Sequence, residues 1–101
     1  MNNTIWKYSV PFAGEFTLDM PKGAEVLTLQ LQEGEPVMWV AVDPDAEKEE
    51  IKFSLIGTGH AVDFELIQSN YIGTYQELGG KLVWNLFQHK YSVLRARVAI
   101  K

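Results

Sequence analysis

The sequence contains no cysteine, which excludes disulfide bonds, a thiol nucleophile and a thiolate metal site. No apolar stretch approaches the roughly 18 residues that a membrane span needs. The opening residues, MNNTIWKYSV, lack the basic region followed by an apolar run that a secretory signal requires. We therefore expect a cytoplasmic protein with no membrane partner.

Histidine is scarce, and the two that occur, His60 and His89, do not stand at a metal-ligand spacing with the acidic segment 43–50. Ser54, His60 and Asp63 supply the residue types of a catalytic triad. However, nothing around Ser54 resembles the strand-to-helix elbow of such a nucleophile. The sequence thus predicts no metal, no cofactor and no catalytic residue, and we expect the protein not to be an enzyme.

An excess of positive charge is also missing, since the formal net charge is −4. We therefore expect no DNA partner. All 13 acidic residues and only four bases lie in 1–80, whereas 81–101 holds five bases and no acid. The basic end either pairs with the acidic face of the same chain or receives an anionic ligand or an acidic partner.

Apolar and polar residues mostly alternate along the chain, which is typical of β-strands with one solvated face. In EFTLDM, Phe16, Leu18 and Met20 share one face. In LTLQLQ the apolar face is Leu27, Leu29 and Leu31, and in IKFSLI Ser54 points outward. PVMWVAV, residues 36–42, is apolar throughout and predicts a strand covered on both faces.

Turn residues divide these segments into hairpins at Gly34 and at Gly79–Gly80. Segment 61–70 predicts one helical turn with Asp63 as its cap, and 93–100 predicts a last strand or a short helix. The length suits one domain, residues 1–101. The predicted fold is mainly β: a compact antiparallel sandwich or partly closed barrel of seven to eight short strands with at most one short helix. The strands are expected at 5–10, 15–20, 27–32, 36–42, 51–56, 71–75, 81–88 and, as the alternative to a helix, 93–100.

Gly57-Thr58-Gly59-His60 is the strongest candidate for a site. Consecutive backbone N–H groups around glycines can cup an anion, and a histidine adds a donor. A lone Gly-x-Gly is a weak signal, because the same glycines also serve to take a chain out of a strand. Both interpretations stay open at this point.

Several motifs in order resemble a family of short proteins of tailed phages and prophages whose function is unknown. They are IWKYSV, MPKGAEVLTLQLQ, MWVAVDP, FSLIGTGHAV and YIGTYQELGGKLVWNLF, and they cover about residues 4–87. In that family the position of Asn85 is often His, and the segment after Gln88 is usually shorter. The resemblance implies a phage setting and no established activity.

A phage setting would favour an accessory protein that acts on the host in its cytoplasm. The leading hypothesis is a counter-defence factor that inhibits host immunity by sequestering a nucleotide-type signal or by blocking a host defence protein. For an anionic nucleotide, the ligand-binding residues would be Gly57, Thr58, Gly59, His60, Tyr75, Arg95 and Arg97, gathered across the subunits of a homo-oligomer. The alternative is a minor structural or assembly protein that acts through self-association.

Overall fold

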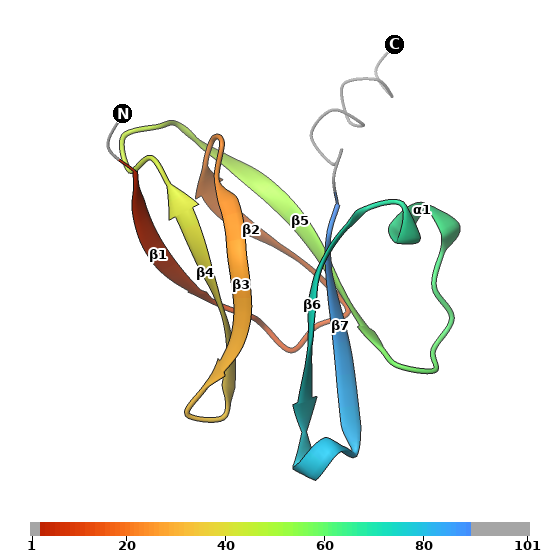
Figure 1. Ribbon diagram of the computed structural model, residues 1–101. Helices are drawn as coiled ribbons and strands as arrows, with labels where there is room; N and C mark the ends of the chain where they lie inside the picture. The colour runs from red at the N-terminus through yellow and green to blue at the C-terminus, as the bar shows by residue number, and fades with distance from the viewer. Residues whose placement is uncertain (1–2, 90–101) are drawn as a thin grey trace.

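The computed structural model describes residues 3–89, and this part of the chain contains seven strands, one four-residue helix and one 3₁₀ turn (Figure 1). The prediction of a mainly β, antiparallel fold is confirmed. The prediction for 93–100 lies outside the described residues. The elements are β1 (Thr4–Ser9), β2 (Glu15–Pro21), β3 (Glu25–Gln32), β4 (Glu35–Val42), β5 (Lys48–Gly57), α1 (Phe64–Ile67), β6 (Asn70–Glu77), η1 (Leu78–Gly80) and β7 (Leu82–Gln88).

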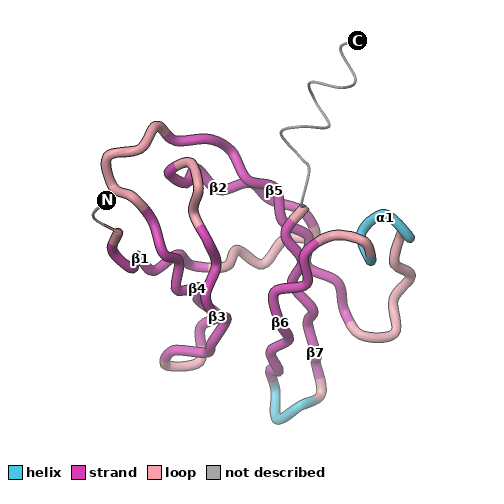
Figure 2. The backbone as a smooth tube through the Cα atoms, turned by 45° about the horizontal axis from the view of Figure 1, so that its top comes forward, coloured by secondary structure: helices cyan, strands magenta, loops and turns pink. Residues whose placement is uncertain are grey.

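The strands form two antiparallel sheets that face each other and do not close into a barrel (Figures 1 and 2). The first sheet has the order β1-β4-β3, and the second has the order β2-β5-β7-β6. The β3–β4 and β6–β7 pairs are the two predicted hairpins. Their turns contain Gly34 and Gly79 with φ of 82° and 65°, a backbone conformation that glycine adopts without steric cost.

The core lies between the sheets and is made mainly of the inward faces of β4, β5 and β7 and of the edge strand β2. Its most deeply buried side chains, all less than 2% exposed, are Phe53, Met20, Met38, Leu86, Val40, Val42 and Pro21. Phe16 stacks on Phe53 with ring centroids 5.3 Å apart, which joins β2 to β5 inside the core. The alternation in EFTLDM and IKFSLI therefore identified the buried faces correctly.

One predicted apolar face, that of LTLQLQ, is correct at Leu29 but wrong at Leu27 and Leu31, which are exposed. The pairing of β3 with β4 shifts between Val26 and Thr28, and this irregularity brings Val26 and Leu29 against the core. Leu27 is left 50% exposed rather than buried. Because one extra residue reverses the side-chain alternation of a strand, the pattern in LTLQLQ could not place Leu27 correctly.

The connection from β5 to β6, residues 58–69, loops out beside the second sheet and carries α1 (Figures 1 and 2). The predicted helical turn is confirmed. Asp63 is its N-cap residue, although the carboxylate makes no capping hydrogen bond. Leu66 is the buried residue of α1, whereas Phe64 and Ile67 are exposed. This connection covers part of the sheet's outer face, the face turned away from the core.

Candidate functional site

The Gly57–His60 segment forms a tight turn at the end of β5. The His60 amide donates to the Gly57 carbonyl at 3.0 Å, and Gly59 has a φ of 94°. The Thr58 amide donates to the Val83 carbonyl at 2.9 Å, which extends the pairing of β5 with β7. Two of the four amides are thus used within the protein, so the turn is a smaller anion cup than the sequence suggested.

His60 lies on the inward side of this turn, against Gly57 and Trp84. A Cβ atom built on Gly57 would lie 3.2 Å from the Trp84 ring and 3.3 Å from the His60 ring. The absence of a side chain at Gly57 therefore lets both rings approach the strand. Phe12 adds a third ring, packed edge to face on Trp84 with centroids 5.2 Å apart.

These rings line a largely apolar pocket of about 380 Å³. It lies where the chain between β1 and β2 passes the end of β5. Its lining residues are Phe12, Ala13, Gly14, Leu55, Ile56, Gly57, His60, Ala61 and Trp84. A pocket with aromatic walls and one imidazole suits an apolar or aromatic group with a single hydrogen-bonding atom.

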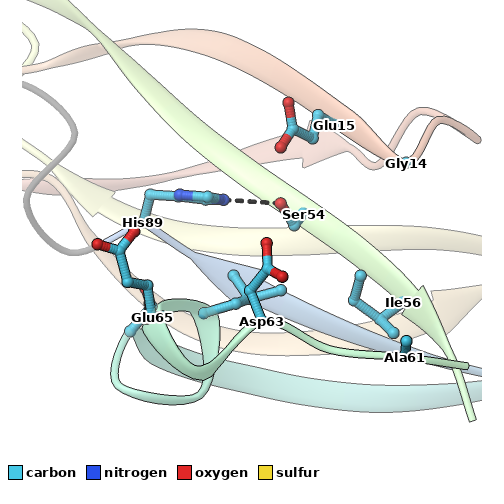
Figure 3. Close-up of a pocket in the computed structure, with 10 residues that line it drawn as sticks. Gly14, Glu15, Ser54, Ile56, Ala61, Asp63, Glu65 and His89 are labelled. Atoms are coloured by element: carbon cyan, nitrogen blue, oxygen red, sulfur yellow. Dashed lines mark hydrogen bonds between the residues drawn. The ribbon is translucent and has the colours of Figure 1, made fainter.

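A second, polar pocket of about 180 Å³ lies on the outer side of β5 (Figure 3). Inside it, Ser54 Oγ and His89 Nε2 are 2.7 Å apart. Ser54 does point away from the core, as its position in the alternation predicts, but it is only 2% exposed. The expectation of a solvated serine is wrong because the 58–69 connection and His89 cover this part of the strand.

Carboxylates dominate the electrostatics of the polar pocket. Glu15, Asp63 and Glu65 line it, and among its lining residues within 3–89 His89 has the only basic side chain. Figure 3 shows the Asp63 carboxylate pointing toward Ser54. Glu15 also forms an exposed ion pair with Lys52 at 3.5 Å. The field in this pocket favours a cation or a hydrogen-bond donor over an anion.

The apolar and polar pockets adjoin, because Gly14, Ile56 and Ala61 line both. We call the pair the two-part cleft. It has an aromatic end at Phe12 and Trp84 and an acidic end at Asp63. The cleft follows the edge of β5 at the place where the pairing with β2 begins, at Glu15 and Ser54.

The Ser54–His89 pair is not arranged as a hydrolase nucleophile. In many hydrolases the amide after the nucleophile stabilises the oxyanion. Here the Leu55 amide donates to the Gly14 carbonyl at 2.9 Å. Ser54 also lies within a continuous strand, and its side chain is nearly inaccessible to solvent. The geometry is that of a structural hydrogen bond.

The other predicted ligand residues do not join this cleft within the described part of the chain. Tyr75 is 6% exposed and belongs to the core, in a cross-strand row with Trp84 and Gly57. Burial, and secondarily the charge of Glu77, raise its pKa to about 12. Tyr75 is therefore not placed to stack on a ligand at the surface. Arg95 and Arg97 lie outside the described residues.

Sequence reasoning missed Phe12, Ser54 and His89 as residues of the cleft. Phe12 follows a proline in a connecting segment, which gave no sign of a pocket. Ser54 and His89 are 35 positions apart, and only the pairing of β5 with β7 brings them together. No spacing rule along the chain could have found that contact.

Residues 3–89 contain no helix long and apolar enough to cross a membrane. In the same residues no group of three or more His, Asp or Glu side chains could hold a metal ion.

A comparison with protein families matches residues 1–95 to a domain of unknown function, DUF7352. No curated protein and no solved structure matches the chain. The family match spans nearly the whole sequence, in line with the resemblance to a family of unknown function. The chain belongs to the DUF7352 family.

Proposed function

We propose that the protein is a non-enzymatic binding protein that holds a segment of a partner protein in the two-part cleft. The observation that carries this proposal is the junction of an aromatic pocket with an acidic pocket along one strand edge. A segment with an apolar side chain next to a Lys or Arg side chain complements both ends.

This arrangement favours a protein partner over an anionic nucleotide. A phosphate near Asp63 would meet the carboxylates of Glu15 and Glu65 as well. Within residues 3–89, neither pocket is lined by a lysine or an arginine. Nucleotide binding would therefore depend on Arg95 and Arg97. Of the two forms of the counter-defence hypothesis, blocking a host protein is the better supported.

The phage setting and the action in a host cytoplasm rest on the motif resemblance alone. In that setting the cleft would capture a basic, partly apolar segment of a host defence protein and so inhibit it. Without a phage setting, the same cleft would suit an adaptor protein that binds a basic, partly apolar segment of a partner.

Self-association is the second candidate, and the open sheets favour it. The first sheet ends in β1 and β3, and the second ends in β2 and β6. Edge strands offer unpaired amide and carbonyl groups to another chain. Sedimentation of the purified protein over a range of concentrations tests for a homo-oligomer, and a monomer at every concentration would remove this candidate.

The cleft proposal is tested with a fluorescently labelled short peptide of alternating Phe and Arg and a matched peptide of alternating Phe and Glu. We expect saturable binding of the Phe-Arg peptide that weakens as salt is added, because the exposed charges are screened. The Phe-Glu peptide should bind much more weakly. Equal binding of both peptides would contradict the charge argument, and no binding of either would contradict the proposed function.

Two variants locate the peptide. Asp63→Asn removes the charge but retains a good helix N-cap residue, so α1 should persist. It should weaken Phe-Arg binding by about twofold to fivefold, the range for an exposed ion pair. Phe12→Ala removes a ring that is 75% exposed and should weaken binding of the apolar group. Asp19→Asn, at an exposed position of β2 outside both pockets, is the matched charge control.

A further inference from the structure

A chain of hydrogen bonds crosses the outer face of the second sheet beside the acidic pocket. Tyr71 and Thr74 on β6, Asn85 on β7 and Thr58 after β5 are its members, and we call them the polar ladder. Tyr71 Oη bonds Thr74 Oγ1, and Thr74 Oγ1 bonds Asn85 Oδ1 at 2.8 Å. Asn85 Nδ2 donates to the Ile56 carbonyl at 3.0 Å and to Thr58 Oγ1 at 2.9 Å.

The direction of every bond in the ladder follows from Asn85. The Ile56 carbonyl can only accept, so it fixes which end of the Asn85 amide is Nδ2. Asn85 Oδ1 can only accept, so Thr74 donates its hydroxyl proton to it. The Tyr71 hydroxyl must then donate to Thr74, and Thr58 must accept from Asn85.

The ladder therefore has a donor at one end and an acceptor at the other. The hydroxyl proton of Thr58 is not used within the ladder, and Thr58 is exposed. At the opposite end, the Tyr71 oxygen gives its proton to Thr74 and keeps its lone pairs for a donor. Both Nδ2 protons of Asn85 are donated within the ladder. Thr58 therefore remains the donor end of the ladder and Tyr71 the acceptor end.

Tyr71 also provides a flat surface. Its hydroxyl reaches Thr74, three residues along the same extended strand, so the ring must lie along β6 rather than project into solvent. Phe87 supports the ring, with centroids 5.5 Å apart and the planes tilted by 57°. The Tyr71 side chain nevertheless remains largely accessible, because the residue is 54% exposed.

The ligand that complements these groups is neutral and carries both donors and acceptors. All four ladder side chains present hydroxyl or amide groups, in contrast to the carboxylates of the neighbouring polar pocket. The ladder spans three adjacent strands, or about 10 Å at the usual strand spacing, a length comparable to two linked sugar rings. The C–H face of a sugar ring packs well on the electron-rich face of an aromatic ring.

From these observations we infer that the polar ladder is a binding site for a neutral saccharide. One sugar ring stacks on Tyr71, and a ring oxygen or hydroxyl of the next sugar accepts the Thr58 proton. The site is separate from the two-part cleft and does not depend on the function proposed for it. Gln76 is exposed two residues beyond Thr74 on the same strand and extends the neutral surface.

The test uses the full chain, labelled with ¹⁵N, and three neutral trisaccharides: maltotriose, cellotriose and tri-N-acetylchitotriose. We expect at least one of them to shift the amide signals of Thr58, Tyr71, Thr74 and Asn85 in a saturable way. The dissociation constant should be millimolar, as suits a few neutral contacts. Because no charge takes part, the affinity should not change with salt, unlike peptide binding in the cleft.

Three variants separate the parts of the site. Tyr71→Ala should abolish saccharide binding, Tyr71→Phe should retain the platform but weaken binding several-fold, and Thr58→Val should also weaken it several-fold. Amide spectra of the variants show whether the fold persists. Asp63→Asn, which impairs the cleft, should leave saccharide binding unchanged.

Two results would overturn the inference. One is the absence of saturable shifts with all three trisaccharides at 20 mM. The other is a set of shifts centred on His60 and Phe12 that Asp63→Asn alters and Tyr71→Ala does not. Neither result bears on peptide binding, which is measured separately.

Discussion

Ser54 Oγ lies 2.7 Å from His89 Nε2, and this bond joins the middle of β5 to the residue that follows β7. The serine is buried beneath the 58–69 connection, so the pair lies where the sheet, this connection and the residue after β7 meet. The contact stabilises the floor of the polar pocket and sets the position of the imidazole in it.

Ser54→Ala should lower the free energy of unfolding by about 1 kcal/mol, since one hydrogen bond is lost and a small cavity forms. Urea denaturation measures this change. The matched control is Ser9→Ala, an exposed serine at the end of β1, which should change stability by less than about 0.5 kcal/mol. Equal effects of the two substitutions would mean that the Ser54–His89 bond contributes nothing to the free energy of unfolding.

Gly57→Ala should alter the apolar pocket without unfolding the protein. The added methyl would lie 3.3 Å from the His60 ring and 3.2 Å from Trp84, so the exposed His60 ring must move. We expect a shifted His60 ring resonance and weaker binding of the Phe-Arg peptide. Gly14 lines the same pocket but has nothing within 4 Å of an added Cβ, so Gly14→Ala should leave the His60 ring resonance unchanged.

Leu66→Ala should loosen the connection that covers Ser54. Leu66 is 8% exposed and is the buried residue of α1. Truncating it should cost about 2 kcal/mol and speed amide exchange in residues 58–69. Ile67→Ala on the same helix removes a side chain that is 57% exposed and should do neither. Unchanged exchange in Leu66→Ala would show that another contact holds the connection.

Stability should fall at high pH because of Tyr75. Its pKa is about 12 in the folded protein, against 10.0 for the ordinary side chain, so the unfolded chain loses the proton first. The contribution of Tyr75 is present below pH 10 and is lost as the pH rises from about 10 to 12. Tyr75→Phe should show a smaller loss of stability over this range in urea denaturation. An identical pH profile in both proteins would contradict the raised pKa.

The fold could be predicted from the sequence where one face of a strand meets the core. In β2 and β5 the alternation placed Phe16 and Phe53 correctly, because burial on one side alone produces that pattern. The start of β5 was misplaced at Ile51 instead of Lys48, since the charged residues 47–50 resemble a solvated turn although 48–50 pair with β2. The predicted burial of Leu27 was wrong for a different reason, namely the extra residue in β3.

The site was predictable only in part. The glycines marked the Gly57–His60 turn, because positive φ is a local property that the residue type reveals. The Ser54–His89 bond and the walls of the cleft depend on which strands pair. No short segment of the sequence determines that pairing. The burial of Tyr75 could not be predicted, because a tyrosine in a strand suits either a solvated face or the core, and its core position follows only from the packing of the two sheets.

An amide NMR titration of the full chain with the unlabelled Phe-Arg peptide tests directly whether the two-part cleft holds the peptide. We expect shifts confined to residues that line the cleft, above all Ile56, Gly57, Ala61 and Asp63, with the Asp63 effect lost at high salt. Shifts spread over the edge strands, or no shifts at saturating peptide, would show that the cleft is not the binding site.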